Sequence, residues 1–483
     1  MKKIKNSKEI LSHGDIHSKQ ILLEITDETL SMLDSRKRLK KFISYDNNTL
    51  RIGDVKWDTS KYRDIYVIGA GKACNHMAAA AEEILGNRIK KGIAIVKKIE
   101  PEIDNFERIE AYEGGHPIPN EEGVKASERI IDLIDNAGSD DLFIALISGG
   151  STALMCSPID GITLDEKKTA TDLLLKSGAN IVEINSVRRH ISKLNGGNLA
   201  KRIERIGAEL IGIAIYDAND FQIDGDCYKP QKFHGTPIAY DNTTLEDAIR
   251  TIEKYNLEEK MPASIVHFLK NCGPEGETPK AFPHFTYFVL NTIPDSCNYA
   301  MEVAKKRGIP SMVLTSSIAG ESREAGIFLA SIAREIQNYE RPIKPPCVVI
   351  CAGETTTTIS EDNIIKGHGG PSQELVTSFA TEAQDIPGVA ILSIDTEGTD
   401  GTTDVAGGIT DSTTYRRAVE KGIDLFSSLK EHSTYESLGQ LRSTIATGNT
   451  GTNLSDFNIM YVPGINKKQT DRSGGAIPNT NDS

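Results

Sequence analysis

The chain has 483 residues and a formal net charge of −13, from 55 Lys and Arg against 68 Asp and Glu. This acidic balance disfavours binding to nucleic acid or anionic membranes, since both need a positive surface, and no run of about 18 apolar residues predicts a transmembrane helix. The seven cysteines form no CxxC pair and predict neither a disulfide framework nor a zinc site. The first residues lack the apolar stretch of a secretory signal, so we expect a cytoplasmic protein.

Short apolar segments alternate with helical ones along most of the chain. After about sixty polar, largely helical residues, the predicted strands are 64–68, 92–97, 141–147, 209–215, 285–290, 312–315, 347–351 and 389–394. Near-continuous apolar strands separated by helical stretches indicate parallel sheets covered by helices on both faces. The sequence therefore predicts an α/β protein with mainly parallel sheets.

The length suggests two or three domains at roughly 100–200 residues each. Residues 271–284 are dense in Pro, Gly and polar residues, as is typical of a seam. We expect an N-terminal domain over 1–275 and a smaller C-terminal α/β domain over 276–465. The polar tail over 466–483 is expected to be disordered.

Two glycine-rich turns follow predicted strands and precede helices: GAGKA at 69–73 and SGGSTAL at 148–154. Such turns let the backbone approach a ligand and favour anions, and Lys72 adds a cation. Neither turn is a Walker A loop, and Cys74 stands where a dinucleotide fingerprint has its third glycine. Each could be only a tight connection, but two of them together favour a protein that handles phosphate.

Two further segments carry charge. Residues 185–200 hold Arg188, Arg189, His190 and Lys193, which could grip a carboxylate or phosphate or could be a solvated helix face. Residues 395–408 hold several carboxylates among glycines, and oxygen ligands suit magnesium, although a metal-free acidic turn would have the same composition.

Taken in order, these segments resemble the type II glycerate kinases, whose C-terminal part is called the MOFRL domain. The matching pieces, spread over residues 60–465, are GAGKA, GGHPIPNEEG, ISGGSTALMCSP, GANIVEINSVRRHISKLNGGNLA, GETT, GGPSQE, SIDTEGTDGTTDVAGGITD and ATGNTGTNLSDF. The resemblance implies a Rossmann-like N-terminal domain, a MOFRL-like segment over 345–465 and an active site in the cleft between two domains.

The same resemblance implies an ATP- and magnesium-dependent kinase that converts D-glycerate to 2-phosphoglycerate, with Lys72 in catalysis. We expect Arg188 to hold the acceptor carboxylate, and Asp395 or Asp400 to bind magnesium or orient the hydroxyl. The residues expected to contact the nucleotide are Gly69, Gly71, Ser148, Gly149, Gly150, Ser151, Glu354 and Gln373. The expected partner is a small hydroxy acid, and the expected assembly a monomer or homodimer.

Two departures from the family pattern leave the substrate and the reaction open. Pro371 occupies the position of the arginine in the family motif GGRNQE. Residues 216–244 differ from the family pattern except at Asp217. The acceptor could therefore be a related sugar acid. The sequence is also compatible with a nicotinamide-dependent hydroxypyruvate reductase, or with a non-catalytic relative that only binds a small acid.

Overall fold

The computed structural model describes residues 2–218, 229–231, 235–282, 284–359 and 366–465. The chain forms two compact units. The central unit comprises 30–296 and 449–455, and the terminal unit comprises 1–29, 297–448 and 456–483. The divergent segment 216–244 lies partly, and the expected tail over 466–483 wholly, outside the described residues.

The central unit is built on a parallel sheet, six-stranded in the part described, with the order β6-β5-β4-β7-β8-β9. Its strands are β4 (Ile65–Ala70), β5 (Ile89–Val96), β6 (Ile109–Glu113), β7 (Leu142–Ile147), β8 (Glu209–Tyr216) and β9 (Thr286–Thr292). The strand order reverses between β4 and β7, which makes this the switch point of a doubly wound, Rossmann-like fold. Both strands are buried along their whole length, as their unbroken apolar sequences predict.

Helices cover both faces of this sheet. α5 (Glu121–Asp135) and α9 (Asn198–Arg205) share a core with the face that bears Ile68 and Phe143. α4 (Cys74–Leu85) packs on the other face, where the missing side chain of Gly69 leaves room for the Cys74 thiol. α3 (Ser35–Phe42) precedes a small antiparallel sheet of β1 (Ile43–Asp46), β2 (Thr49–Ile52) and β3 (Val55–Asp58).

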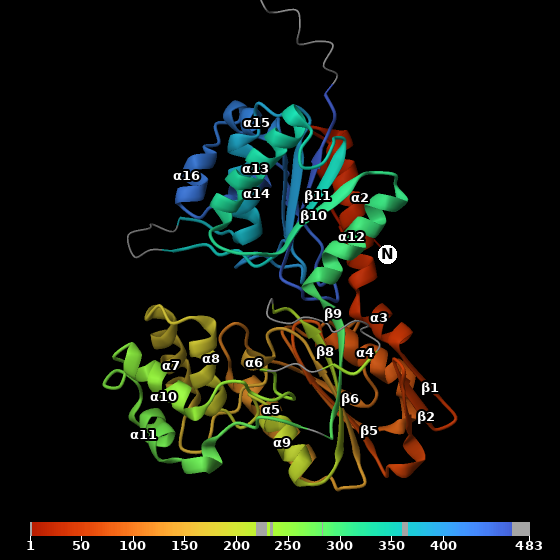
Figure 1. Ribbon diagram of the computed structural model, residues 1–483, viewed down its shortest axis with the longest axis vertical. Helices are drawn as coiled ribbons and strands as arrows, with labels where there is room; N and C mark the ends of the chain where they lie inside the picture. Colours follow the sequence, from red (N-terminus) through yellow and green to blue (C-terminus); the bar gives the residue numbers. More distant parts are fainter. Residues whose placement is uncertain (1, 219–228, 232–234, 283, 360–365, 466–483) are drawn as a thin grey trace, which may run out of the picture. The chain divides into compact units, whose positions relative to one another are not determined.

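A helical subdomain with its own apolar core lies beside the sheet of the central unit (Figure 1). It consists of α7 (Leu164–Lys176), α8 (Ile181–His190), α10 (Leu245–Lys254) and α11 (Ala263–Asn271). Thr163, Asn180 and Thr244 cap α7, α8 and α10 through capping boxes, so the sequence sets where each of these helices begins.

The terminal unit holds a second sheet, also six-stranded as far as it is described, with the order β10-β11-β15-β12-β13-β14. Its strands are β10 (Ser311–Ile318), β11 (Cys347–Gly353), β12 (Ala390–Asp395), β13 (Gly407–Asp411), β14 (Thr444–Ile445) and β15 (Asp456–Val462). Among these described strands only β10 and β11 pair in parallel, so the expectation of mainly parallel sheets is wrong for this unit. The physical reason is the connection from β12 to β13, a loop without a crossover helix, which returns the chain antiparallel.

Helices flank this sheet too, with α13 (Ser322–Tyr339) and α14 (Pro371–Glu382) on one side and α2 (Ile16–Leu33) and α12 (Ile293–Lys306) on the other (Figure 1). The apolar faces of α13 and α14 share a core with β11, β12 and β15. The shorter helices are α1 (Ser7–Ile10), α6 (Ser151–Leu154), α15 (Thr414–Glu420), α16 (Leu425–Lys430), α17 (Thr434–Gln440) and the 3-10 turns η1 (Thr59–Lys61), η2 (Gly86–Arg88) and η3 (Gly273–Gly276).

The boundaries between the two units fall at positions where the sequence shows no sign of a domain boundary. The Pro- and Gly-rich segment 271–284 precedes β9, which still pairs with β8 in the central unit. The first 29 residues belong with the C-terminal half of the chain, and residues 449–455 belong with the N-terminal half. The limits 1–275 and 276–465 stay a proposal about which segments fold independently.

Candidate functional site

The two glycine-rich turns lie side by side because they follow β4 and β7, which are neighbouring parallel strands. Lys72 N donates to Gly149 O over 3.0 Å, and Ala73 N donates to Ser148 Oγ over 3.0 Å. Gly71 has a φ of +140°, and a Cβ there would lie 2.1 Å from Ser148 Oγ. The first turn therefore needs glycine to fit against the second one, independently of any ligand.

Lys72 and His116 flank the second turn. A Cβ at Gly150 would lie 3.2 Å from Lys72 Cγ and 2.9 Å from His116 Cδ2, so both side chains pass close over this glycine. Both are half-buried. α6, which begins at Ser151, has a single turn, so its dipole can add little attraction for anions. Any anion bound at this turn would therefore depend on Lys72 and on backbone amides.

Asp217, the one family residue kept at the end of β8, bonds to a residue of the distant family-matching segment 446–457. Asn453 Nδ2 donates to Asp217 Oδ2 over 2.9 Å. Gly149 lies under this pair, because a Cβ there would be 1.9 Å from Asp217 Oδ2 and 2.0 Å from Asn453 Nδ2. Asp217 and Asn453 thus lie together with the two turns at the switch point.

Asn453 reaches this place through the loop 449–455, which belongs to the central unit. Ser35 N donates to Gly451 O over 2.9 Å, and Asn449 Nδ2 donates to Glu100 Oε1 over 2.6 Å. In the sequence, this stretch of Gly, Thr and Asn has the character of an ordinary turn. Its signal is its richness in amide and hydroxyl groups, which does not reveal the partner.

The basic segment of α8 and the following loop is mostly paired within the protein. Arg189 Nη1 lies 2.7 Å from Asp241 Oδ1, His190 Nε2 lies 3.0 Å from Glu277 Oε1, and Lys193 Nζ lies 2.9 Å from Asp160 Oδ1. These three therefore have structural roles.

Arg188 differs from its neighbours. It donates a hydrogen bond to the neutral amide of Asn185, at 3.4 Å, and no carboxylate among the described residues forms an ion pair with it.

In the terminal unit, Asp400 is buried and caps α14. Its carboxylate accepts hydrogen bonds from Ser372 N (3.1 Å), Gln373 N (2.9 Å) and Gln373 Nε2 (2.9 Å). Pro371 occupies the first turn of this helix, where its missing N–H is not needed. The change from the family arginine is therefore compatible with the local backbone.

A second carboxylate, Asp456 at the start of β15, lies near Asp400. It accepts from Thr355 N (3.3 Å), Thr355 Oγ1 (3.2 Å) and Ser372 Oγ (3.4 Å). Burial and then the charge of Asp400 raise the pKa of Asp456 to about 8, and burial raises that of Asp400 to about 6. Asp456 was not predicted as a site residue, because the chain between Asp400 and Asp456 gives no sign that they meet.

The other expected residues of the terminal unit have varied surroundings. Glu354 is exposed just after β11, whereas Gln373 is buried and its Nε2 also donates to Thr403 Oγ1 over 3.1 Å. Asp395 is half-buried, and its Oδ1 accepts from Glu397 N over 2.9 Å. No group of three or more His, Cys, Asp or Glu side chains suited to a metal occurs within the described residues. Magnesium can bind through one or two carboxylates with substrate phosphates, and Asp395 fits that requirement better than the fully bonded Asp400.

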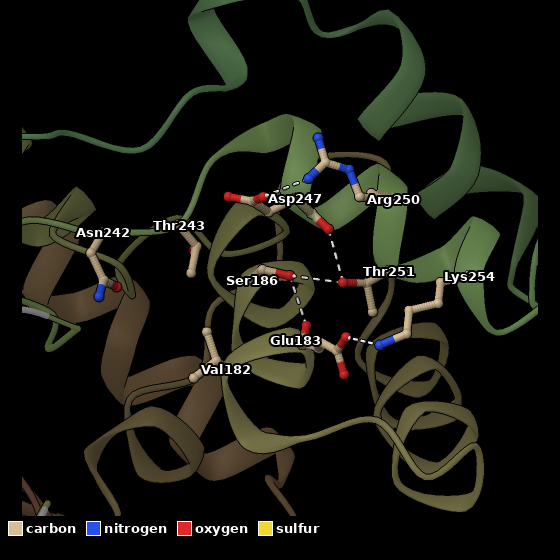
Figure 2. Close-up of a pocket in the computed structure, with 9 residues that line it drawn as sticks. All are labelled: Val182, Glu183, Ser186, Asn242, Thr243, Asp247, Arg250, Thr251 and Lys254. Atoms are coloured by element: carbon tan, nitrogen blue, oxygen red, sulfur yellow. Dashed lines mark hydrogen bonds and ion pairs between the residues drawn. The ribbon is translucent and has the colours of Figure 1, made fainter. Parts of the chain in front are cut away.

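A pocket of about 290 Å³ opens between α8 and α10 in the helical subdomain (Figure 2). Its charged side chains pair with one another or with neighbours: Lys254 Nζ lies 2.5 Å from Glu183 Oε1, and Arg250 Nη2 lies 2.8 Å from Glu246 Oε1. No lining residue belongs to either glycine-rich turn. The pocket therefore presents no charge that calls for a ligand.

Comparison with known proteins identifies the family. Residues 21–270 match the family described as "Domain of unknown function (DUF4147)", and residues 347–456 match the MOFRL family. A glycerate 2-kinase of Pyrococcus horikoshii is 40% identical over 401 residues, covering 82% of this chain and 87% of that protein. The chain belongs to the glycerate 2-kinase family.

Two further relatives differ in the activity that they are named for, and one of them supports the fold. The crystal structure of a glycerate kinase from Thermotoga maritima superposes with a TM-score of 0.74 at 32% identity, covering 92% of this chain and 99% of that one. A protein of Agrobacterium vitis with the provisional name of a hydroxypyruvate reductase is 30% identical over 453 residues, covering 94% of this chain and 96% of its own. Across the residues described, none of the helices has the length and apolar character to cross a membrane.

Proposed function

We propose that this protein is an ATP-dependent glycerate 2-kinase, which transfers the γ-phosphoryl group of ATP to the 2-hydroxyl of D-glycerate. The observation that carries the proposal is the pair of glycine-rich turns with Lys72 at the sheet switch point, where α/β proteins bind ligands. Family membership with glycerate 2-kinases supports the reaction type.

Phosphoryl transfer depends chiefly on positioning and on stabilising charge. Lys72 lies over the second turn and supplies a positive charge for the transferred group. Arg188, which has no carboxylate partner among the described residues, is proposed to bind the acceptor carboxylate. The carboxylate of Asp217, held by Asn453, is positioned to orient a hydroxyl near Gly149.

The expected nucleotide contacts remain proposals, and their surroundings differ. Ser148, Gly149, Gly150 and Ser151 form the turn beside Lys72, and Gly69 and Gly71 keep the adjoining turn close to it. Glu354 is exposed, whereas the Gln373 side chain is held by Asp400 and Thr403. Magnesium, proposed to bind through Asp395 and less readily through Asp400, would supply neutralisation of the phosphate oxygens.

The reductase hypothesis is weakened by the surroundings of Cys74. In a dinucleotide-binding turn the third glycine permits close packing of helix and strand. Here the Cys74 thiol is buried and occupies the space over Gly69, where a Cβ would be 2.6 Å from Sγ. A related sugar acid as acceptor stays the second candidate, because the segment 216–244 departs from the family pattern. We further propose a cytoplasmic enzyme, monomeric or homodimeric, with a small hydroxy acid as its partner.

Phosphorus NMR of the purified protein with ATP, magnesium and D-glycerate tests the proposal, with erythronate and hydroxypyruvate plus NADH as parallel samples. The expected result is a new phosphomonoester assigned as 2-phosphoglycerate. A phosphoester formed only from another acid would show that the protein is a kinase with a different acceptor. NADH oxidation without any phosphoester would show that the protein is a reductase and not a kinase.

A further inference from the structure

One lysine outside the expected site residues is buried and has no oxygen or nitrogen atom to bond within the described part of the chain. Lys167 lies on α7 three and seven residues before Ala170 and Leu174, whose side chains belong to the core of the helical subdomain. Its side chain is on the same buried face of the helix, and the residue is only 3% exposed. Nζ has no oxygen or nitrogen partner among the described residues, and burial lowers the pKa of the ammonium group.

The polar neighbours of Lys167 are a thiol and another cation. Cys156 favours the charged ammonium, Arg188 on α8 opposes it, and no carboxylate of the described residues acts on it. Arg188 has the same surroundings: Cys156 favours its charge, Arg189 opposes it, and it bonds to the Asn185 amide at 3.4 Å. Arg189 is neutralised by Asp241, so Lys167 and Arg188 have no carboxylate counter-ion in the part of the chain described.

Burying a charge without a partner is unfavourable, as the loss of stability on removing one member of a buried ion pair shows. Folded proteins tolerate such a site where a ligand supplies the missing charge. α7 and α8 share one apolar core, and Arg188 lies close enough to Lys167 to oppose its charge. Two cations with no carboxylate partner in the described part of the chain are thus neighbours, which is the arrangement that an anion would complete.

We propose that Lys167 and Arg188 together form the binding site for the carboxylate group of the acceptor acid, with Lys167 as a specificity-determining residue. This inference rests on the proposed function, in which Arg188 binds the acceptor carboxylate, and adds Lys167 to that site as a second cation. The half-buried Arg188 offers a planar fork for two carboxylate oxygens, and Lys167 adds a point charge from the inner side. A hydroxy compound without a carboxylate leaves both cations unpaired and is therefore disfavoured.

The chain links this pair to the second glycine-rich turn. Cys156 follows Gly150 by six residues, after the single turn of α6. Asn195 Nδ2 donates to Thr152 O and to Met155 O, each over 3.3 Å, and so fixes the segment that carries Cys156. The carboxylate site is thus attached through one short segment to the turn that Lys72 covers.

The test uses Lys167→Met in the full chain, with Lys168→Met as the matched control. Lys168 is the next residue of α7, is half-exposed and pairs with Asp165 at 3.6 Å. Calorimetry measures the binding of D-glycerate and, separately, of inorganic phosphate to each protein without nucleotide. Steady-state kinetics measure KM for glycerate and for ATP, and thermal unfolding without ligand checks the fold.

We expect Lys167→Met to bind D-glycerate on the order of 10–100-fold more weakly and to raise its KM similarly, with KM for ATP unchanged. The ligand-free variant should unfold at the same temperature as the wild type or higher, since an unpaired buried charge is gone. Lys168→Met should match the wild type throughout. A merely structural lysine would show the opposite pattern: a lower unfolding temperature with unchanged glycerate affinity.

Arg188→Met provides a second variant should Lys167→Met not fold, and it should weaken glycerate binding to a similar degree. Wild-type affinity in the folded variants, no glycerate binding by the wild type, or a selective loss of phosphate binding would each overturn the inference. If the wild type binds glycerate through Lys167 but forms no phosphoester, the carboxylate site stands and the proposed kinase activity fails. If 2-phosphoglycerate forms but the variants keep the wild-type KM for glycerate, the proposed kinase activity stands and the carboxylate site fails.

Discussion

Lys19 Nζ lies 3.2 Å from Asp411 Oδ2, and neither side chain has exposed surface. The pair joins α2, near the start of the chain, to the end of β13 within the terminal unit. Nζ also donates to His13 O over 2.8 Å, while Asp15 N donates to Asp411 Oδ2 over 2.9 Å. Both ions are thus hydrogen-bonded as well as paired, which a buried ion pair requires.

Removing one member of this pair should destabilise the terminal unit. Lys19→Met leaves Asp411 as a buried charge without its partner, so the free energy of unfolding should fall by about 3–5 kcal/mol. Denaturant titration measures this change. Lys306→Met, which removes an exposed pair with Glu302, is the control and should lose less than about 1 kcal/mol. Equal losses in the two variants would contradict the role given to Lys19.

Replacing Lys72 should reduce turnover without unfolding the protein. Lys72→Met removes the positive charge over the second glycine-rich turn, and kcat/KM for glycerate should fall on the order of 10²–10³-fold. A coupled assay of ADP release measures this loss. Lys90→Met, an exposed lysine on β5, should keep wild-type activity. Near-native turnover of the Lys72 variant would remove Lys72 from the mechanism.

A single methyl group at Gly149 should disturb the pair of Asp217 and Asn453. The added Cβ would lie about 2 Å from atoms of both side chains, so Gly149→Ala must push them apart. We expect at least about tenfold lower kcat/KM, because small misplacements in an active site are costly. Gly439→Ala, where a Cβ meets no atom within 4 Å, is the control and should stay fully active. Unchanged activity in both variants would show that the pair does not serve the reaction.

The buried carboxylates near α14 should make stability depend on pH. Burial and Asp400 raise the pKa of Asp456 to about 8 from the 3.8 of a free aspartate, so the folded protein holds a proton that the unfolded chain releases. Between about pH 4 and pH 8, the free energy of unfolding should therefore fall as pH rises, by at most about 1.4 kcal/mol per pH unit for this group.

Asp456→Asn removes the group that titrates near pH 8 and should flatten this slope above about pH 6, the value to which burial raises the pKa of Asp400. Chemical denaturation at several pH values between about 6 and 8 measures it. Asp385→Asn, which alters an exposed carboxylate paired with Arg334 at 2.8 Å, is the control and should leave the slope unchanged. A slope that persists in Asp456→Asn would place the titrating group elsewhere.

The strands of the central sheet were predictable because each of β4, β7 and β8 is buried and reads as a continuous apolar run. β13 and β15 were not, although both are fully buried. β13 begins with two glycines, and β15 opens with Asp456 and contains Asn458, so neither resembles an apolar strand. Their antiparallel pairing follows from tertiary contacts that periodicity does not encode.

The candidate site likewise contains residues that the sequence predicts and residues that only tertiary contacts bring together. Lys72 and the glycine-rich turns were predictable because their signal is local: a strand end, glycines and a helix start. The bond between Asp217 and Asn453 joins positions 236 residues apart, and no property of either residue announces the other. Lys167 does leave a trace, since it occupies an apolar position in the pattern of α7, where a lysine is unexpected.

The loop 449–455 has a consequence for synthesis of the chain. It completes the central unit from a point more than 150 residues beyond the rest of that unit. At about 5–20 residues per second, the ribosome needs on the order of ten to thirty seconds to extend the nascent chain from Ser296 to Ser455. During that interval Asn453 has not yet been synthesised, so its hydrogen bond to the Asp217 carboxylate cannot form. A nascent chain released before residue 449 would lack the loop that completes the switch point of the central unit.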